Sequence, residues 1–173
     1  LPEKTTFPLA TKVSINPQMP LLEEEITSRA DVSREVKVSF LNSFDTCIGK
    51  VISAVKQGQC VVWVRNTVND TLEAYEAILR KLDEPEDCLL FHSRFVLQDR
   101  KSIEDKVLAT FGKYSTNSIR RGKVLIATQV FQESLDADAD VMISDICPID
   151  DLIQRAGRLH RHIRNANGAH QHN

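Results

Sequence analysis

The stretch CVVWV, residues 60–64, is a continuous apolar run with polar residues on both sides. It is too short for a typical helix, and an unbroken apolar run of this length is typical of a β-strand covered on both faces. Three later stretches have similar apolar centres: CLLF (88–91), KVLIAT (123–128) and ADVMISD (139–145). A further stretch, Val36–Phe40, alternates apolar and polar residues, as a half-buried strand does.

Apolar residues recur at helical spacing between these runs. One predicted helix carries Ile48, Val51, Ile52 and Val55 and stops at Gly58. A second opens at a capping box of Asp70 and Glu73 and turns Leu72, Tyr75, Leu79 and Leu82 inward. A third carries Ile103, Val107, Leu108 and Phe111 and ends at Gly112, and a last helix begins at Pro148. This alternation predicts an α/β domain with a mostly parallel sheet flanked by helices.

Polar clusters follow the predicted strands, at the points where the strands end. They are WVRNT (63–67), FHSRF (91–95), ATQVFQESLD (127–136) and QRAGRLHRH (154–162). Because the carboxyl ends of parallel strands meet at one edge of a sheet, we expect these clusters to lie together and to carry the function.

Length and composition predict one domain with attached tails. A chain of 173 residues that is 42% hydrophobic can bury one core. Residues 1–34 hold four of the six prolines and an acidic run, which indicates a lead-in or linker, although PLATKVSI (8–15) fits an edge strand. Residues 35–164 form the predicted domain, and residues 165–173, which have no apolar periodicity, are expected to be a disordered tail.

Charge and special residues narrow the function. The net charge of −2 argues against a uniformly basic nucleic-acid binder, but Arg155 to Arg164 form a local basic patch where an anion is expected. Arg120 and Arg121 are expected in a solvated loop, and Trp63 in the core. The four cysteines form no CxxC and are expected to be reduced thiols, and no metal site is predicted from the two H-x-H pairs. No apolar run reaches the roughly 18 residues of a membrane span and no leader opens the chain, so a cytoplasmic location is expected.

No phosphate-binding loop G-x-x-x-x-G-K-[ST] occurs in the sequence. GKYS (112–115) has the lysine, but it lacks the preceding glycine-rich turn and the adjacent hydroxyl residue. No His-Asp dipeptide of a metal-dependent phosphohydrolase occurs either. This chain alone is therefore not expected to bind and cleave a nucleotide.

The nonapeptide QRAGRLHRH (154–162) places arginines three apart. On a helix, Arg155, Arg158 and Arg161 would fan round the axis, so that two of them could share one target. A pair such as Arg158 and Arg161 suits bidentate hydrogen bonding to a polyanion. Gly157 would allow another backbone to approach closely, and Gln154 could bridge neighbouring carboxylates and amides.

Q-R-x-G-R-x-x-R resembles the sixth motif of superfamily-two helicases. In that family the last two arginines reach the γ-phosphate of ATP on a partner lobe, which implies this role for Arg158 and Arg161, with Gln154 and Arg155 as coupling residues beside Gly157. Such an arginine can be worth about 10³–10⁵ in rate. ATQVFQESLDADADVMISD (127–145) is similar to the fifth motif, which implies phosphate contacts for Thr128 and Gln129 and a ribose contact for Asp136.

Several stretches together resemble one branch, the helicase-nuclease of type I CRISPR systems. The resemblance runs from about Val36 to Arg164 and rests on VWVRNTV (62–68), HSRF (92–95) and QRAGRLHRH. It implies a RecA-like three-layer fold and a single-stranded DNA track lined by Arg65, Asn66 and Thr67 and by His92, Ser93 and Arg94. One departure is that the family usually has V-E-Q-S-L-D where residues 130–136 are VFQESLD, which exchanges Gln132 and Glu133.

The resemblance implies the second motor lobe of an ATP-dependent DNA helicase or translocase in antiviral defence, inactive without its first lobe. ATP and Mg²⁺ would be held mainly by that first lobe. The implied partners are single-stranded DNA, the first lobe, an HD-type nuclease domain and a guide-RNA surveillance complex. Two alternatives stay open from the residues: a lobe of another superfamily-two helicase, such as a DEAD-box-like RNA helicase, and a non-catalytic Rossmann-like module that binds a small anion.

Overall fold

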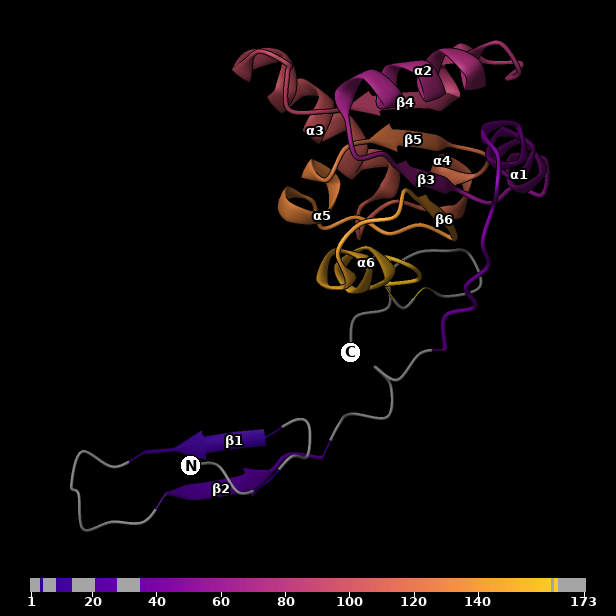
Figure 1. Ribbon diagram of the computed structural model, residues 1–173. Coiled ribbons are helices and arrows are strands. Elements are labelled where there is room, and N and C mark those ends of the chain that lie inside the picture. Colours follow the sequence, from indigo (N-terminus) through magenta and orange to yellow (C-terminus); the bar gives the residue numbers. More distant parts are fainter. Residues whose placement is uncertain (1–3, 5–8, 14–20, 28–34, 163, 165–173) are drawn as a thin grey trace. The chain divides into compact units, whose positions relative to one another are not determined.

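The computed structural model describes residues 4, 9–13, 21–27, 35–162 and 164 (Figure 1). The chain divides into two compact units, Leu1–Lys37 and Val38–Asn173. In the first unit, β1 (Leu9–Lys12) pairs antiparallel with β2 (Leu22–Glu25). The PLATKVSI segment therefore does contain a strand, but that strand pairs with the acidic run in a sheet of its own.

The second unit contains a four-stranded parallel sheet. Its strands are β3 (Val61–Val64), β4 (Cys88–Phe91), β5 (Val124–Ala127) and β6 (Val141–Ser144), in the spatial order β4-β5-β3-β6. All three ladders are parallel. The four apolar runs of the sequence thus form the four strands, as predicted.

Helices cover both faces of this sheet (Figure 1). The helices are α1 (Phe44–Lys56), α2 (Val68–Leu79), α3 (Leu97–Phe111), α4 (Asn117–Arg120), α5 (Val130–Ser134) and α6 (Ile149–Ala156), with a 3₁₀ turn, η2, at Pro85–Asp87. α1 and α2 pack on one face with Val61, Trp63, Val124 and Ile126, and α3 and α5 pack on the other with Val62, Val64, Leu125 and Ala127. The strand residues alternate between two cores, which explains why the strands are apolar throughout. The α/β prediction is confirmed.

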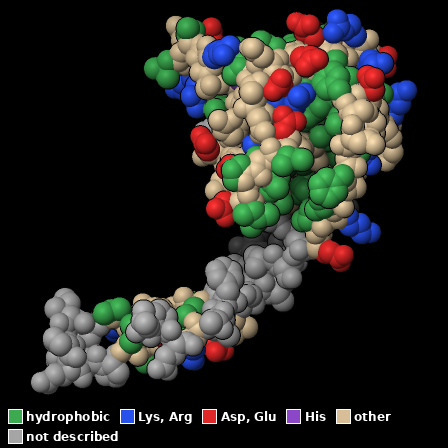
Figure 2. All heavy atoms as spheres, in the orientation of Figure 1, with side chains coloured by type: hydrophobic (Ala, Val, Ile, Leu, Met, Phe, Trp, Pro, Cys, Tyr) green, Lys and Arg blue, Asp and Glu red, His purple; other side chains and the backbone are tan. Residues whose placement is uncertain are grey.

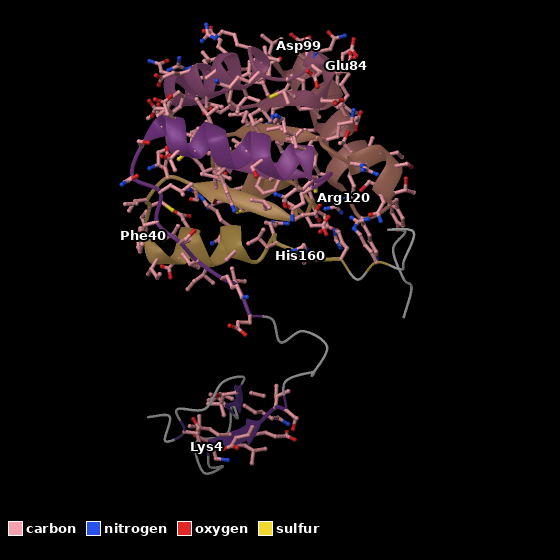
Figure 3. The ribbon with its side chains drawn as sticks, turned by 90° about the vertical axis from the view of Figure 1, so that its right-hand side faces the viewer. Lys4, Phe40, Glu84, Asp99, Arg120 and His160 are labelled. Atoms are coloured by element: carbon pink, nitrogen blue, oxygen red, sulfur yellow. The ribbon has the colours of Figure 1, made fainter. Side chains whose placement is uncertain are left out.

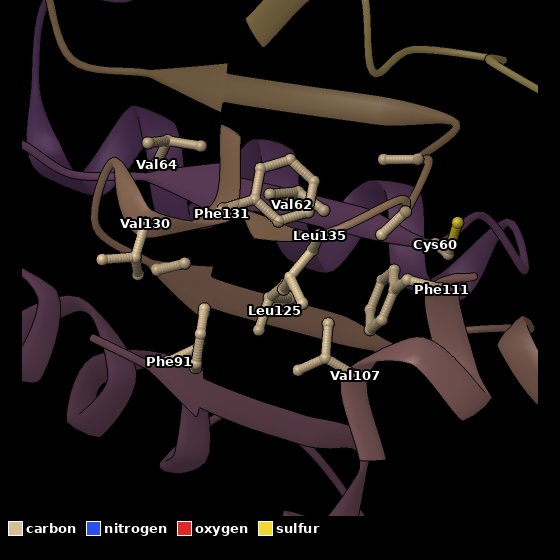
Figure 4. Packing of buried hydrophobic residues seen from close by; sticks show 13 residues of the cluster. Cys60, Val62, Val64, Phe91, Val107, Phe111, Leu125, Val130, Phe131 and Leu135 are labelled. Atoms are coloured by element: carbon tan, nitrogen blue, oxygen red, sulfur yellow. The ribbon is translucent and has the colours of Figure 1, made fainter. Parts of the chain in front are cut away.

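The core on the α3 and α5 side is built around aromatic rings. Figure 4 shows Phe91, Phe111 and Phe131 with Leu125 and Val107 between α3, α5 and the sheet. Each of these five side chains is fully buried. On the other face Trp63 is 1% exposed and its ring centroid lies 5.5 Å from that of Phe44, which confirms Trp63 as a core residue.

Two helix boundaries follow from local capping. Ser43 Oγ accepts from the Thr46 amide at the start of α1, and Gly58 follows the helix with a φ of +76°, a conformation that favours glycine. α2 begins one turn earlier than predicted, because Thr67 Oγ1 accepts from the Asp70 amide at 3.1 Å. Ala74 and Ile78 are buried, and Tyr75, Leu79 and Leu82 pack against the same core as predicted, whereas Leu72 is 38% exposed.

The predicted strand at Val36–Phe40 is wrong. Residues 35–42 form neither helix nor strand, and Val38 and Phe40 are 80% and 90% exposed. Figure 3 labels Phe40 in this segment, outside the helices and strands. The ladders of the described sheet join only β3, β4, β5 and β6, so alternation within this segment finds no partner strand. The predicted tail, residues 165–173, lies outside the described residues.

Helix α6 turns its polar face toward the core and its apolar face outward. Its one buried side chain is Arg155, whereas Ile149 and Ile153 are 67% and 63% exposed, and Ile146 just before the helix is 80% exposed. Figure 2 shows hydrophobic side chains gathered at the lower end of the domain, where Figure 1 places α6. The polar face of α6, not its isoleucine stripe, packs inward.

Candidate nucleotide and nucleic-acid site

The loops that leave the four strands meet at one edge of the sheet. Backbone hydrogen bonds continue beyond the strands: Thr128 N donates to Phe91 O, Arg65 N to Ala127 O, and Asp145 N to Val64 O. Each bond ties the first residue of one loop to its neighbouring strand. The clusters after β3, β4 and β5 therefore gather at the carboxyl edge, as predicted. The prediction is wrong for the end of QRAGRLHRH, because Leu159 and His160 pair with Ala139, which precedes β6 at the amino ends of the strands.

The loop after β3 is held by Asp145, which follows β6. Arg65 Nε donates to Asp145 Oδ2 at 2.9 Å, and the Asn66 amide donates to the same oxygen at 3.0 Å. The Arg65 guanidinium also lies over the Trp63 and Phe44 rings, at 5.2 and 5.6 Å from their centroids, and its Nη1 is buried without a hydrogen-bond partner. Asn66 Nδ2 donates to Ile146 O, and Thr67 caps α2, so all three predicted DNA-contact residues of this loop already have internal partners.

In the loop after β4, only two of the three residues predicted to contact DNA are exposed. His92 is 7% exposed, stacks on Phe95 with a centroid distance of 4.1 Å, and accepts from the Arg94 amide at Nδ1. Burial, with a contribution from the Arg94 charge, lowers the pKa of His92. Ser93 and Arg94 are exposed, and Arg94 Nη1 lies 3.5 Å from Asn69 Oδ1.

The two predicted DNA-contact residues of the loop after β5 differ in exposure. Thr128 is 3% exposed, and its buried Oγ1 has no hydrogen-bond partner, whereas Gln129 is exposed. In α5, Gln132 is 4% exposed, donates from Nε2 to Asp151 Oδ1 at 2.6 Å and accepts from Arg155 Nε at 2.7 Å. Glu133 is exposed. In the exchanged pair, Gln132 thus faces the interior of the domain and Glu133 faces solvent.

The arginine-bearing segment, QRAGRLHRH (154–162), is not one continuous helix. α6 ends at Ala156 with Gly157 as its C-cap, and His160 has a φ of +45°. Leu159 pairs with Ala139 in an isolated parallel bridge and packs against the aromatic core. The predicted helical fan of three arginines is therefore wrong, because a core contact at Leu159 pulls the chain off the helix. A Cβ at Gly157 would first meet the Gln154 carbonyl of α6 itself, at 3.2 Å.

Arg155 and Arg158 bind α5 and the loop that follows it. Arg155, 3% exposed, donates to Gln132 Oε1, to Ser144 Oγ at 2.7 Å and to Asp145 O at 3.3 Å. Arg158 donates from Nη1 to Leu135 O at 2.6 Å and from Nη2 to Gln132 O at 2.7 Å. Burial and the nearby Arg161 charge lower the pKa of Arg158, partly offset by Asp136. Gln154 is exposed and does not join this cluster in any described contact.

Arg161 makes an exposed ion pair with Asp136. Arg161 Nε lies 2.8 Å from Asp136 Oδ1, and the two side chains are 43% and 56% exposed. His162 Nε2 lies 3.6 Å from the same oxygen. The two residues that the fifth and sixth motifs singled out for the nucleotide are thus direct neighbours.

The sequence reasoning missed four acids and two basic residues. Asp145 and Asp151 hold Arg65 and Gln132, while Asp138 and Asp140 bind Arg120, and Asp138 also binds Arg164. Arg120, expected in a solvated loop, is 3% exposed, because α4 turns it toward these acids; Arg121 is exposed as expected. The pattern D-A-D-A-D at 136–140 was the available signal, since its two alanines are buried and bring the acid between them, Asp138, into the core.

Within the described residues, no group of three or more His, Cys, Asp or Glu side chains is placed to hold a metal ion. No helix of that part of the chain is long and apolar enough to cross a membrane. Cys60 and Cys88 are free and buried, and burial raises the pKa of each thiol to about 12.

Sequence comparison identifies relatives for most of this domain. Residues 57–164 match the family described as CRISPR-associated nuclease/helicase Cas3, C-terminal. The CRISPR-associated endonuclease/helicase Cas3 of Escherichia coli (strain K12) is 40% identical over 119 residues, which are 69% of this chain and 13% of that protein. The corresponding Thermus thermophilus protein is 36% identical over 117 residues, 68% of this chain and 12% of its own. The chain thus spans a small part of the length of these relatives.

Solved structures agree with the sequence matches. A crystal structure of a CRISPR-associated protein superposes with a TM-score of 0.82 at 26% identity, covering 92% of this chain and 17% of that one. T. fusca Cas3-ATP superposes with a TM-score of 0.67 at 33% identity, covering 83% and 18%. A chain of a CRISPR RNA-guided surveillance complex, pre-nicking, has a TM-score of 0.56 at 35% identity, covering 69% and 14%.

The parallel sheet flanked by helices, together with the sequence and structural relatives, identifies the second RecA-like lobe of a superfamily-two helicase. The chain belongs to the family of the CRISPR-associated nuclease/helicase Cas3, in its C-terminal region.

Proposed function

We propose that this chain works as the second motor lobe of an ATP-dependent DNA helicase or translocase in CRISPR antiviral defence. The supporting relatives are named as nuclease/helicases, and T. fusca Cas3 has been solved with ATP and with ADP. In this proposal a first lobe with a P-loop holds ATP and Mg²⁺, and the present lobe completes the site. A surveillance complex supplies the DNA, and an HD-type nuclease domain receives it.

The exposure of Arg161 is the observation that carries the proposal. An ion pair between side chains as exposed as Arg161 and Asp136 contributes about 0–1 kcal/mol. A triphosphate can therefore replace the Asp136 carboxylate at little cost. Arg161 is the guanidinium that reaches the γ-phosphate, where such a charge accelerates hydrolysis by about 10³–10⁵.

Arg158 has a different part in the same site. Its two bonds to Leu135 O and Gln132 O are charge-assisted and partly buried, so they cost more to break than the Arg161 pair. These bonds use two of its five donors, which leaves the guanidinium able to face a phosphate without releasing the carbonyls. Arg158 thus holds the loop after α5 and touches the nucleotide from that fixed position. Gln154, Arg155 and Gly157 couple this contact to α6.

Asp136 exchanges partners when ATP binds. In the described structure its Oδ1 accepts from Arg161, and it is more than half exposed. Once Arg161 turns to the phosphates, the same carboxylate accepts from a ribose hydroxyl. This exchange would link nucleotide binding to the loop that follows α5.

Single-stranded DNA is held by the exposed polar groups of the strand-end loops. Ser93, Arg94, Asn66 and Gln129 are exposed and contact the DNA backbone in this proposal. Arg65, Thr67, His92 and Thr128 are tied to internal partners or buried, and they act by holding those loops in shape. Contacts of this kind grip phosphates without selecting a base sequence.

ATP hydrolysis by the two-lobed protein tests the nucleotide part. Arg161→Ala is expected to lower the kcat of DNA-stimulated hydrolysis about 10³-fold, equivalent to about 4 kcal/mol, with little change in the KM for ATP. Arg121→Ala removes another exposed arginine, which follows α4, and serves as the control. A kcat for Arg161→Ala within twofold of the wild type would refute the proposal. The present chain without a first lobe is expected to hydrolyse no ATP.

DNA binding by the present chain tests the second part. Fluorescence anisotropy with a labelled dT oligonucleotide is expected to show weak binding whose log K falls linearly with log salt. Arg94→Ala should reduce that slope by about 0.7, the value for one phosphate contact on a single strand. Binding that does not respond to salt, or a tight complex with a small anion such as pyrophosphate, would instead support the anion-binding module.

A further inference from the structure

An acid outside the nucleotide site holds two arginines. The Asp138 side chain is 1% exposed, and its Oδ1 lies 2.8 Å from Arg120 Nη1 and 2.8 Å from Arg164 Nη2. Its Oδ2 accepts from the His162 amide at 3.3 Å. A carboxylate buried to this degree is costly unless it is paired, and here it is paired from both sides.

Arg120 ties this acid to the sheet. Its Nη2 lies 3.2 Å from Asp140 Oδ1 and donates to Cys60 Sγ at 2.7 Å, at the start of β3. His160 Nδ1 is 3.9 Å from the same Asp140 oxygen, and Figure 3 shows Arg120 and His160 on the same side of the domain. The two acids and two arginines balance each other in charge, so the cluster forms a rigid, neutral anchor.

Arg164 ties the same acid to the end of the arginine-bearing segment. Besides Asp138, its guanidinium donates to Ser115 O at 2.6 Å and to Gly112 O at 3.0 Å. At the other end of the segment, Ala139 N donates to Arg158 O and His160 N donates to Ala139 O, both at 3.0 Å. Arg161 thus lies between His160 and His162, two residues whose backbone amides are each fixed to the 138–139 stretch.

We propose that Asp138 is a positioning residue for ATP hydrolysis, which aims Arg161 by fixing both the His162 amide and Arg164. The proposal rests on the proposed function of Arg161. Asp138 and Arg164 touch neither ATP nor DNA in it; they act through the place of the Arg161 guanidinium. A misplacement of about 1 Å at a reacting centre can cost about 10²-fold in rate, so loss of this anchor should appear in kcat.

The test is a double-mutant cycle in the two-lobed protein. Arg164→Ala frees the end of the segment while leaving the Arg120–Asp138 pair in place, and it is expected to lower the kcat of DNA-stimulated ATP hydrolysis about 10-fold to 10²-fold. The KM for ATP should change less than about twofold, since the effect lies in the transition state. In the Arg161→Ala background the same change should cost less than about twofold, because the group that it positions is gone.

A core variant outside the cluster, and further variants within it, separate a positioning role from general destabilisation of the domain. Val51→Ala leaves a cavity in the core on the other face of the sheet, beneath α1, lowers the melting temperature, and is expected to keep kcat. Arg164→Gln keeps a donor for Ser115 O but loses the charge, and it replaces Arg164→Ala in the cycle if the alanine variant does not fold. Asp138→Asn should reproduce the kcat loss of either variant.

The outcomes distinguish this inference from the function on which it rests. If Arg161→Ala leaves kcat unchanged, the proposed function fails, and the positioning role fails with it. Suppose instead that Arg161→Ala lowers kcat about 10³-fold. If Arg164→Ala then leaves kcat unchanged, or lowers it by the same factor in the wild type and in the Arg161→Ala variant, only the positioning role is overturned.

Discussion

Arg155 and Gln132 form a buried contact between α6 and α5, with Arg155 Nε donating to Gln132 Oε1 at 2.7 Å. Both side chains are less than 5% exposed, and Gln132 is held in turn by Asp151. The contact joins α6, which carries the first arginine of QRAGRLHRH, to α5, which precedes the loop that carries Asp136. It therefore connects the two halves of the proposed nucleotide site within one lobe.

Replacing Gln132 by leucine is expected to destabilise the domain by about 2 kcal/mol. The change removes the acceptor of a buried guanidinium, and a charged donor left without its partner loses a bond of that size. The neighbouring Glu133→Ala is the matched control, because Glu133 is exposed and its loss should stay within about 0.5 kcal/mol. Urea unfolding measures both; equal effects of the two variants would contradict the assignment of Gln132 as the inward residue.

A second matched pair lies at the end of α4. Arg120→Ala is expected to cost about 3 kcal/mol, because the buried Asp138 carboxylate loses one of its two arginine partners and Asp140 loses its ion pair. Arg121→Ala, one residue later and exposed, should change the free energy of unfolding by less than about 0.5 kcal/mol. Chemical denaturation of both variants checks this. A loss below 1 kcal/mol for Arg120→Ala would show that the four-residue charge cluster does not stabilise the fold.

The contrast between these two arginines shows what the sequence could and could not predict. Short apolar runs predict buried strands, so CVVWV and the three similar stretches predict the sheet. The parallel sheet in turn predicts the edge where the loops after the strands meet. Burial of a charge depends on which acids arrive from elsewhere in the chain, and nothing local to Arg120 distinguishes it from Arg121. For the same reason the arginine segment was expected to be helical: Leu159 leaves the helix to pack on a core assembled from distant elements.

Stability should fall in acid as Asp138 is protonated. Burial by itself raises the pKa of this carboxyl, but the hydrogen bond from Arg164 and the charges of Arg120 and Arg164 outweigh burial and lower the pKa. An unfolded aspartate titrates near pH 3.9, so the unfolded chain takes up the proton first. The stabilisation is fully present above that range and is lost as the pH falls through the lower folded value.

Urea midpoints measured between about pH 6 and pH 3 test this sign. The wild type should lose stability more steeply than Asp138→Asn, which has no carboxyl to titrate at this position. Glu133→Gln, a neutralised carboxylate at an exposed position, should follow the wild-type curve. Parallel curves for the wild type and Asp138→Asn would contradict the lowered pKa.

Because the isoleucines of α6 face outward, replacing them by alanine is not expected to lower the free energy of unfolding, as it would in a helix whose isoleucines are buried. Ile149 and Ile153 are 67% and 63% exposed, so Ile149→Ala and Ile153→Ala remove little buried surface. Alanine also has the higher helix propensity, and the free energy of unfolding of this chain should stay unchanged or rise by a few tenths of a kcal/mol. Ile143→Ala, at a position in β6 that is 8% exposed, should instead cost about 2–5 kcal/mol. Thermal and urea unfolding compare the three variants. A loss above about 1 kcal/mol in Ile153→Ala would mean that the apolar stripe of α6 packs inward after all, and with it that Arg155 is not the buried face of this helix.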